Sequence, residues 1–186
     1  MRKTLTILAA FGALASCQTA VPPTRDQVID TRVAMVAGVN PAAVAIWDIT
    51  NEAMDEDGEL DPARMNDEAW ARLREHAEML EVWSRKMADA VVIRAAGPDL
   101  VGGEVPEGVA SRAEIQAMID ADPEGFRAEA RDQAERARLL VEAVRARDVA
   151  AAGHRAAEID VPCQGCHTRY WYKQETPEID DRRPRA

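Results

Sequence analysis

Apolar side chains recur every three or four residues along most of the chain, and this spacing predicts amphipathic helices. The first helix is expected to begin at Thr24 and Gln27, which form a capping pair. Asn40 and Pro41 interrupt it, because Asn caps helices and Pro suits a first helical turn. The chain then either continues as a kinked helix or starts a second segment that runs to about Met54. Nothing in the pattern indicates a strand.

Two longer helices follow, and capping residues mark where they begin. One starts after Asn66 and is expected to end before Ala96-Gly97-Pro98, and the other starts at Asp122-Pro123. A loop rich in Gly and Pro separates them and leads into a short helix capped by Ser111. The expected buried stripe of the first long helix consists of Trp70, Leu73, Ala77, Leu80, Ser84, Met87 and Val91. The stripe of the second consists of Phe126, Ala130, Ala137, Leu140 and Val144.

A last helix is predicted from Asp148 to a segment near the C-terminus that contains two cysteines. Four main helices favour an all-α fold, an antiparallel four-helix bundle in which a cofactor can lie between facing helices. Aromatic residues make up only 4% of the chain, and Ala is abundant at the expected core positions. Such a core leaves room for a large flat group.

The cysteine segment, Cys163-Gln164-Gly165-Cys166-His167, has the C-x-x-C-H pattern that is typical of covalent attachment of c-type haem. Two thiols three positions apart lie on one side of a helical turn and can add to the two vinyl groups of one porphyrin. The imidazole of His167 would then be the proximal ligand of the iron. The sequence therefore predicts one covalent haem c on the last helix.

Three other kinds of site can use two thiols at this spacing. A structural zinc site usually needs four ligands in two pairs, but no second pair exists, and the remaining histidines, His76 and His154, are isolated. A thioredoxin-like redox pair requires a βαβ setting, which the pattern does not indicate. A disulfide between Cys163 and Cys166 is the third alternative.

Residues 1–16 have the pattern of an export signal, with two basic residues before an apolar run that is too short to span a bilayer. The run ends in Leu14-Ala15-Ser16-Cys17, which resembles the lipobox of bacterial lipoproteins. The resemblance implies cleavage before Cys17, lipidation of that residue and a tether over residues 17–24. It also slightly favours the outer membrane, because Gln18 and not Asp follows. The alternative is an ordinary secretory signal followed by an incidental Cys.

Removal of residues 1–16 leaves 21 Lys and Arg against 33 Asp and Glu, a net charge of −12. Such an acidic surface argues against nucleic acid as a partner and would suit a basic redox partner. The sequence shows no Ser/His/Asp set and no Gly-rich phosphate loop. The chain is therefore expected to be an electron carrier and not an enzyme.

These features together resemble class II c-type cytochromes, the cytochrome c-prime family, which carry the haem motif on the last helix of a bundle. The resemblance rests on Val39-Asn40-Pro41-Ala42-Ala43 with Trp47, and on the segment from Cys163 to Trp171. It implies a haem domain over residues 25–174, followed by a polar tail over 175–186. It also implies that a homodimer can form.

The group opposite His167 decides which function such a haem has, and the resemblance implies that the first helix supplies it. Met35 is the candidate, since a Met sulfur gives a six-coordinate iron suited to electron transfer. An apolar side chain there would leave a five-coordinate iron that binds small gases such as nitric oxide. The weaker candidates are Met54, Met79, Met87 and His76.

Tyr170 and Trp171 follow His167 by three and four residues and are expected on its side of the helix, next to the haem. The predicted protein is thus a monohaem c-type cytochrome that faces the periplasm, is anchored to the membrane by lipid and transfers electrons. A gas-binding haem protein and a haem-bearing sensory or structural subunit are the alternatives.

Overall fold

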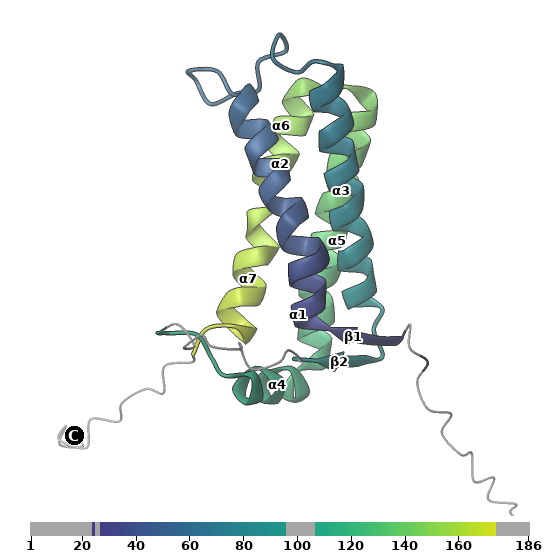
Figure 1. Cartoon of the computed structure of the whole chain (residues 1–186), viewed down its shortest axis with the longest axis vertical. Helices are drawn as coiled ribbons and strands as arrows, with labels where there is room; N and C mark the ends of the chain where they lie inside the picture. The colour runs from purple at the N-terminus through teal and green to yellow at the C-terminus, as the bar shows by residue number, and fades with distance from the viewer. Residues whose placement is uncertain (1–23, 25–26, 96–106, 174–186) are drawn as a thin grey trace, which may run out of the picture.

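The computed structural model describes residue 24 and residues 27–95 and 107–173, and this part of the chain is mostly helical (Figure 1). The predicted helical fold is confirmed over these residues. The predicted signal, residues 1–16 with Cys17, and the predicted tail, residues 175–186, lie outside them. In chain order the elements are β1 (Val28–Asp30), α1 (Thr31–Ala34), the π-helix η2 (Met35–Val39), α2 (Asn40–Ala53), α3 (Asp67–Ala88), β2 (Val92–Arg94), α4 (Arg112–Ala121), α5 (Pro123–Ala146), α6 (Val149–Ala157) and α7 (Asp160–Tyr170).

The first helix begins later than predicted. The backbone N–H of Thr24 does donate to Gln27 Oε1, at 2.9 Å, but the chain then forms the strand β1. The helix starts at Thr31, and Asp30 caps it by accepting a hydrogen bond from the backbone N–H of Val33 at 3.0 Å. The hydrogen-bonded pair Thr24 and Gln27 therefore precedes β1 and does not begin a helix.

The strand pair corrects the expectation that the chain contains no strand. β1 and β2 pair in parallel, with Ile29 opposite Ile93, and both of these side chains are buried in the core. Each strand has only three residues, which is too few to show the alternation of apolar and polar side chains that identifies a longer strand. The pair joins the start of the first helix to the segment that follows α3 (Figure 1).

The interruption at Asn40 and Pro41 is neither a kink nor a new helix but a π-turn. α1, η2 and α2 follow one another without a break, and the N–H of Asn40 donates to the carbonyl of Met35, five residues earlier. Pro41 has no N–H with which to bond Ala37 in a regular α-helix. The π-turn therefore lies just before Pro41, the residue at which a regular α-helix would lack a backbone hydrogen bond.

The segment Thr31–Ala53 is long and apolar enough to cross a membrane by length and composition, and it lies near the N-terminus. One side of it is buried in the core, as Ala42 and Ile46 show, and α2 packs against the helix α3. This burial is what a core helix of a packed domain shows.

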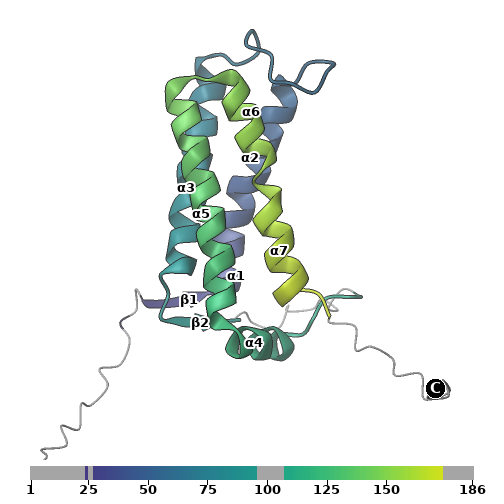
Figure 2. The ribbon, with the colours of Figure 1, turned by 180° about the vertical axis from the view of Figure 1, so that it is seen from behind.

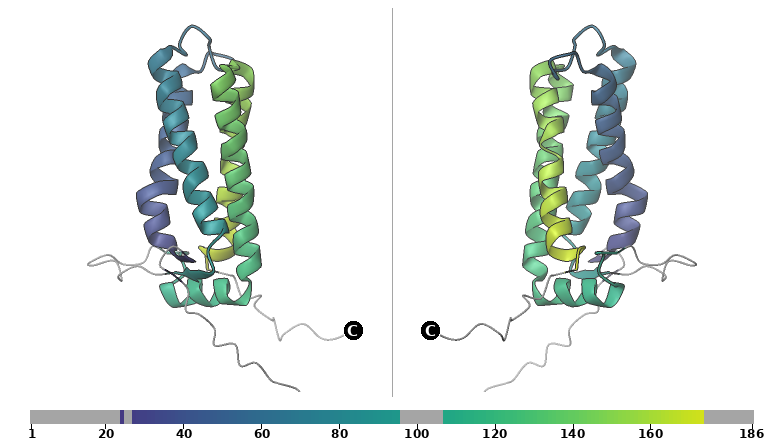
Figure 3. Two further views of the ribbon diagram at one scale, coloured as in Figure 1. Left: turned by 90° about the vertical axis from the view of Figure 1, so that its right-hand side faces the viewer. Right: turned by 90° about the vertical axis from the view of Figure 1, so that its left-hand side faces the viewer.

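The long helices run side by side along the longest dimension of the described chain, and α4 crosses one end (Figure 3). α3 packs along α5, α2 packs against α3, and α6 and α7 follow one another along α5 (Figure 2). The predicted stripe of α3 is buried from Trp70 to Met87. Its last member, Val91, is 55% exposed because the helix already ends at Ala88.

The predicted last helix is divided into α6 and α7 at Glu158 and Ile159. Ile159 is fully buried and fixes the junction in the core. Pro162 lies in the first turn of α7, where a missing N–H costs no helical hydrogen bond. α7 can therefore take a direction different from that of α6, and this direction places the cysteine segment.

Candidate functional site

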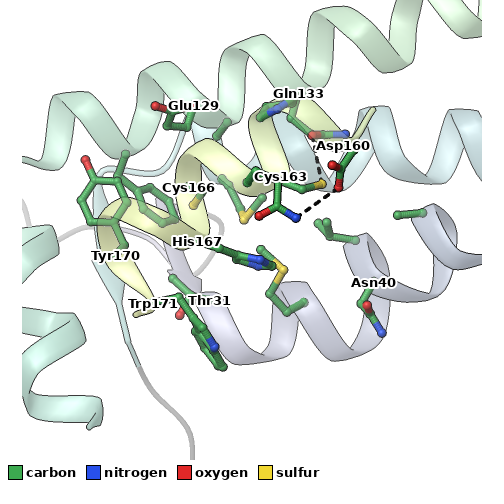
Figure 4. A pocket seen from close by; sticks show the side chains of 18 of the residues that line it. Thr31, Asn40, Glu129, Gln133, Asp160, Cys163, Cys166, His167, Tyr170 and Trp171 are labelled. Atoms are coloured by element: carbon green, nitrogen blue, oxygen red, sulfur yellow. Dashed lines mark hydrogen bonds between the residues drawn. The ribbon is translucent and has the colours of Figure 1, made fainter. Parts of the chain in front are cut away.

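A cavity of about 530 Å³ lies between α7 and the first helix and is closed by α5 and α4 (Figure 4). Its volume is within the range of about 300–1,000 Å³ that ligand pockets occupy. Most of the lining is apolar. The residues that line it are Thr31, Met35, Val36, Val39, Asn40, Ala43, Trp47, Met87, Ile115, Ile119, Phe126, Glu129, Ala130, Gln133, Asp160, Pro162, Cys163, Gln164, Cys166, His167, Tyr170, Trp171 and Tyr172.

The three chemical groups of the cysteine segment face this one cavity. Cys163, Cys166 and His167 all line it, and Figure 4 shows them on the side of α7 that faces the first helix. Both cysteines are free thiols, so the alternative of a disulfide between them is not what the structure shows. Both thiols therefore lie on the side of α7 that faces the cavity.

Burial keeps both thiols protonated at neutral pH. It raises the pKa of Cys163 to about 11, and the nearby carboxylate of Asp160 adds to the effect. It raises the pKa of Cys166 to about 12, with a further contribution from Glu129. Each sulfur therefore carries the hydrogen that an addition to a carbon–carbon double bond needs.

The imidazole of His167 is half-buried, and this burial lowers its pKa, although the carboxylate of Asp160 acts in the opposite direction. A neutral imidazole has a free ring nitrogen that can bind a metal. The rings of Trp171 and Tyr172 lie beside it, with centroids at 6.1 and 6.3 Å. The side chain thus lies among aromatic rings and faces the cavity as a neutral imidazole.

A zinc site finds no support in the geometry. Among residues 24, 27–95 and 107–173, no three Cys, His, Asp or Glu side chains converge as a metal ion would require. His76 lies on α3 and His154 on α6, and neither lines the cavity. His76 is therefore not placed to bind opposite His167.

Met35, the candidate on the first helix, lines the same cavity as His167. It begins the π-turn η2 and lines the cavity from the helix that faces α7. Met87 on α3 also lines the cavity, whereas Met54 and Met79 do not. Met35 and Met87 are thus the two methionines, among the described residues, that line the same cavity as His167.

Tyr170 and Trp171 both line the cavity with His167, but they differ in burial. Trp171 is 41% exposed at the rim. Tyr170 is buried, its hydroxyl donates to the backbone carbonyl of Asp122 at 3.0 Å, and its ring packs edge-on against Phe126 with centroids 5.5 Å apart. Tyr170 therefore anchors the end of α7 to the start of α5. Gly125 leaves room for it, because a Cβ there would lie 2.6 Å from the hydroxyl.

Replacement of Tyr170 by Phe is expected to lower the free energy of unfolding by about 1 kcal/mol, because the hydrogen bond from the hydroxyl to the carbonyl of Asp122 is lost. Tyr170→Leu should cost about 1 kcal/mol more, since it also removes the contact with Phe126. Urea titrations followed by circular dichroism would measure both changes. A Phe variant as stable as the parent would show that the hydroxyl does not anchor α7.

Three polar residues of the cavity were not predicted. Asp160 and Glu129 flank the cysteines, and Gln133 on α5 is only 4% exposed. The thiol of Cys163 donates to Gln133 Oε1 at 3.5 Å, while Gln133 Nε2 is buried with no hydrogen-bond partner among the described residues. Gln133 follows Ala130 by three residues, so its place on an apolar stripe was a signal in the sequence.

Comparison of the chain with protein-family models, with curated proteins and with solved structures found no match.

Proposed function

We propose that this protein is a monohaem c-type cytochrome that transfers electrons. The observation that carries the proposal is that both thiols and the imidazole of a C-x-x-C-H segment face one apolar cavity, which Met35 lines from the facing helix. The fold proposed with it is an antiparallel four-helix bundle of the cytochrome c-prime type, made by the first helix, α3, α5 and the pair α6 and α7.

The donor set and the cavity fit a covalent haem. The thiols of Cys163 and Cys166 are protonated and lie one helical turn apart, so they would hold a porphyrin through two thioether bonds. The neutral imidazole of His167 would bind the iron. The haem iron, when bound, would supply one-electron redox chemistry.

The thioether of Met35 would also hold the iron. Its flexible side chain and soft sulfur suit a haem iron, and two side chains of the same turn, Val36 and Val39, make that wall of the cavity apolar. This apolar wall also favours a second candidate function. If Met35 only packs against the porphyrin, a five-coordinate iron facing the wall could bind a small gas.

The proposal includes export to the periplasm, lipidation of Cys17 and a basic redox partner. It is supported by the export signal and lipobox pattern and by the excess of acidic residues in the sequence. A lipid anchor at residue 17 would hold the haem domain close to a membrane through a short tether.

Replacement of Met35 by Leu tests the proposed function. The ferric parent is expected to have a low-spin absorption spectrum with a sulfur-to-iron charge-transfer band, and Met35→Leu is expected to lose this band and become high-spin. Met87→Leu is the matched control, because Met87 also lines the cavity and should leave the band unchanged. A parent that is already high-spin and binds carbon monoxide rapidly when reduced would instead favour gas binding.

A further inference from the structure

The π-turn η2 has a close neighbour on α3. A Cβ built at Gly38 would overlap the indole ring of Trp83, so the ring lies directly against the backbone of the turn. Trp83 is itself held in place, because the ammonium group of Lys86 lies 4.4 Å from the centre of its ring. Only glycine leaves the helix backbone this near to the ring.

The turn changes which residue faces the core. In a continuous α-helix, Met35 would lie on the same face as the fully buried Ile46, because eleven residues make about three turns. The structure instead places Ala34 in the core, where it is 0% exposed, and Met35 is half-buried along the cavity. The π-turn contains one residue more than an α-helical turn, and this extra residue changes the side of the helix on which Ala34 and Met35 lie.

Two features of the sequence produce the extra residue. Pro41 cannot donate the hydrogen bond that an α-helix would need at this position. Gly38 lets the turn lie against Trp83, so the widened segment still packs on α3. An α-helical turn here would rotate Met35 toward the core and Ala34 out of it.

We propose that Gly38 and Trp83 are positioning residues, and that their contact holds the π-turn so that the thioether of Met35 faces the group bound at His167. This inference rests on the proposed function, because it assigns a purpose to the place of Met35. Neither Gly38 nor Trp83 lines the cavity, so both act through Met35.

Gly38→Ala in the haem-loaded protein is the test. The added methyl group must displace the ring or the turn, and we expect the equilibrium between the Met-bound and Met-free iron to shift by about tenfold toward the free form. The charge-transfer band should weaken, and reduced protein should bind carbon monoxide faster. Gly153→Ala is the matched control. Gly153 is on α6, and its added methyl group would lie near Leu60 and not against η2, so neither signal should change.

A second variant separates positioning from a general loss of fold. Gly38→Ala combined with Trp83→Ala removes the overlap, because the atoms that a Cβ at position 38 would meet are the Cγ, Cδ1 and Cδ2 of Trp83. This pair should restore part of the band, whereas a simple folding defect would become worse. Retention of the full band in Gly38→Ala would overturn the inference.

The methyl resonance of Met35 in protein labelled with ¹³C-methionine gives a measurement that does not depend on ligation. The resonance is assigned with Met35→Leu, and it should move in Gly38→Ala and stay in Gly153→Ala. If Met35→Leu leaves the absorption spectrum unchanged, the proposed Met ligation fails, yet the methyl resonance still decides whether Gly38 positions Met35. An unmoved resonance in Gly38→Ala would overturn the inference even if the ligation is correct.

Discussion

Replacement of both Cys163 and Cys166 by Ala is expected to give an exported polypeptide that lacks the mass of one porphyrin and unfolds with little cooperativity. The cavity of about 530 Å³ would lose the group proposed to fill it, and the helices on either side would lose contacts with that group. The loss in the free energy of unfolding should approach about 5 kcal/mol, which is as large as the whole stability of many small domains.

Mass spectrometry and thermal unfolding of the purified protein measure the two effects. The control is the parent polypeptide produced in a host that cannot attach haem. Like the double variant, it should lack the mass of the porphyrin and unfold with little cooperativity. A double variant that melts as cooperatively and at as high a temperature as the haem-loaded parent would show that the core is complete without haem. A parent without the added mass would refute the proposed function itself.

Replacement of His167 by Gly is expected to leave the covalent mass in place and to change the spectrum completely. The two thioether bonds do not involve the imidazole, but the iron would lose its proximal ligand. The space that opens lies beside Trp171 and Tyr172, so free imidazole can enter it and restore the parent spectrum.

The control for this experiment is His154→Gly, since His154 is exposed on α6 and away from the cavity. Absorption spectra with and without imidazole give the result. If His167→Gly kept the parent spectrum, another side chain would have to be the proximal ligand.

Local signals in the sequence predicted most of the helical structure. The caps at Asn66, Ser111, Asp122 and Asp148 form as expected, because each depends on a side chain and a backbone N–H only two or three residues apart. The strand pair was missed because each strand is short and its partner is more than sixty residues away in the chain. Pro41 marked an interruption, but only the structure shows that the interruption is a π-turn, in which the N–H of Asn40 donates to the carbonyl of Met35.

The candidate site was predictable where its residues are consecutive. Cys163, Cys166 and His167 form a motif, and the resemblance to a family indicated Met35. Gln133 and Glu129 come from α5, and they meet the cysteines only because α7 packs along that helix. Contacts between side chains of different helices depend on tertiary packing, and a single sequence does not show them directly.

Asp160 and Glu129, the two carboxylates that flank the cysteines, would affect the energy of any electron held in this cavity. Oxidised iron carries one more positive charge than reduced iron, and nearby negative charge stabilises the more positive form, most of all where the surroundings are apolar. A haem here would therefore have a lower reduction potential than the same haem between neutral side chains. To place an electron on that haem, a donor would need to be a stronger reductant than one that serves a haem between neutral side chains.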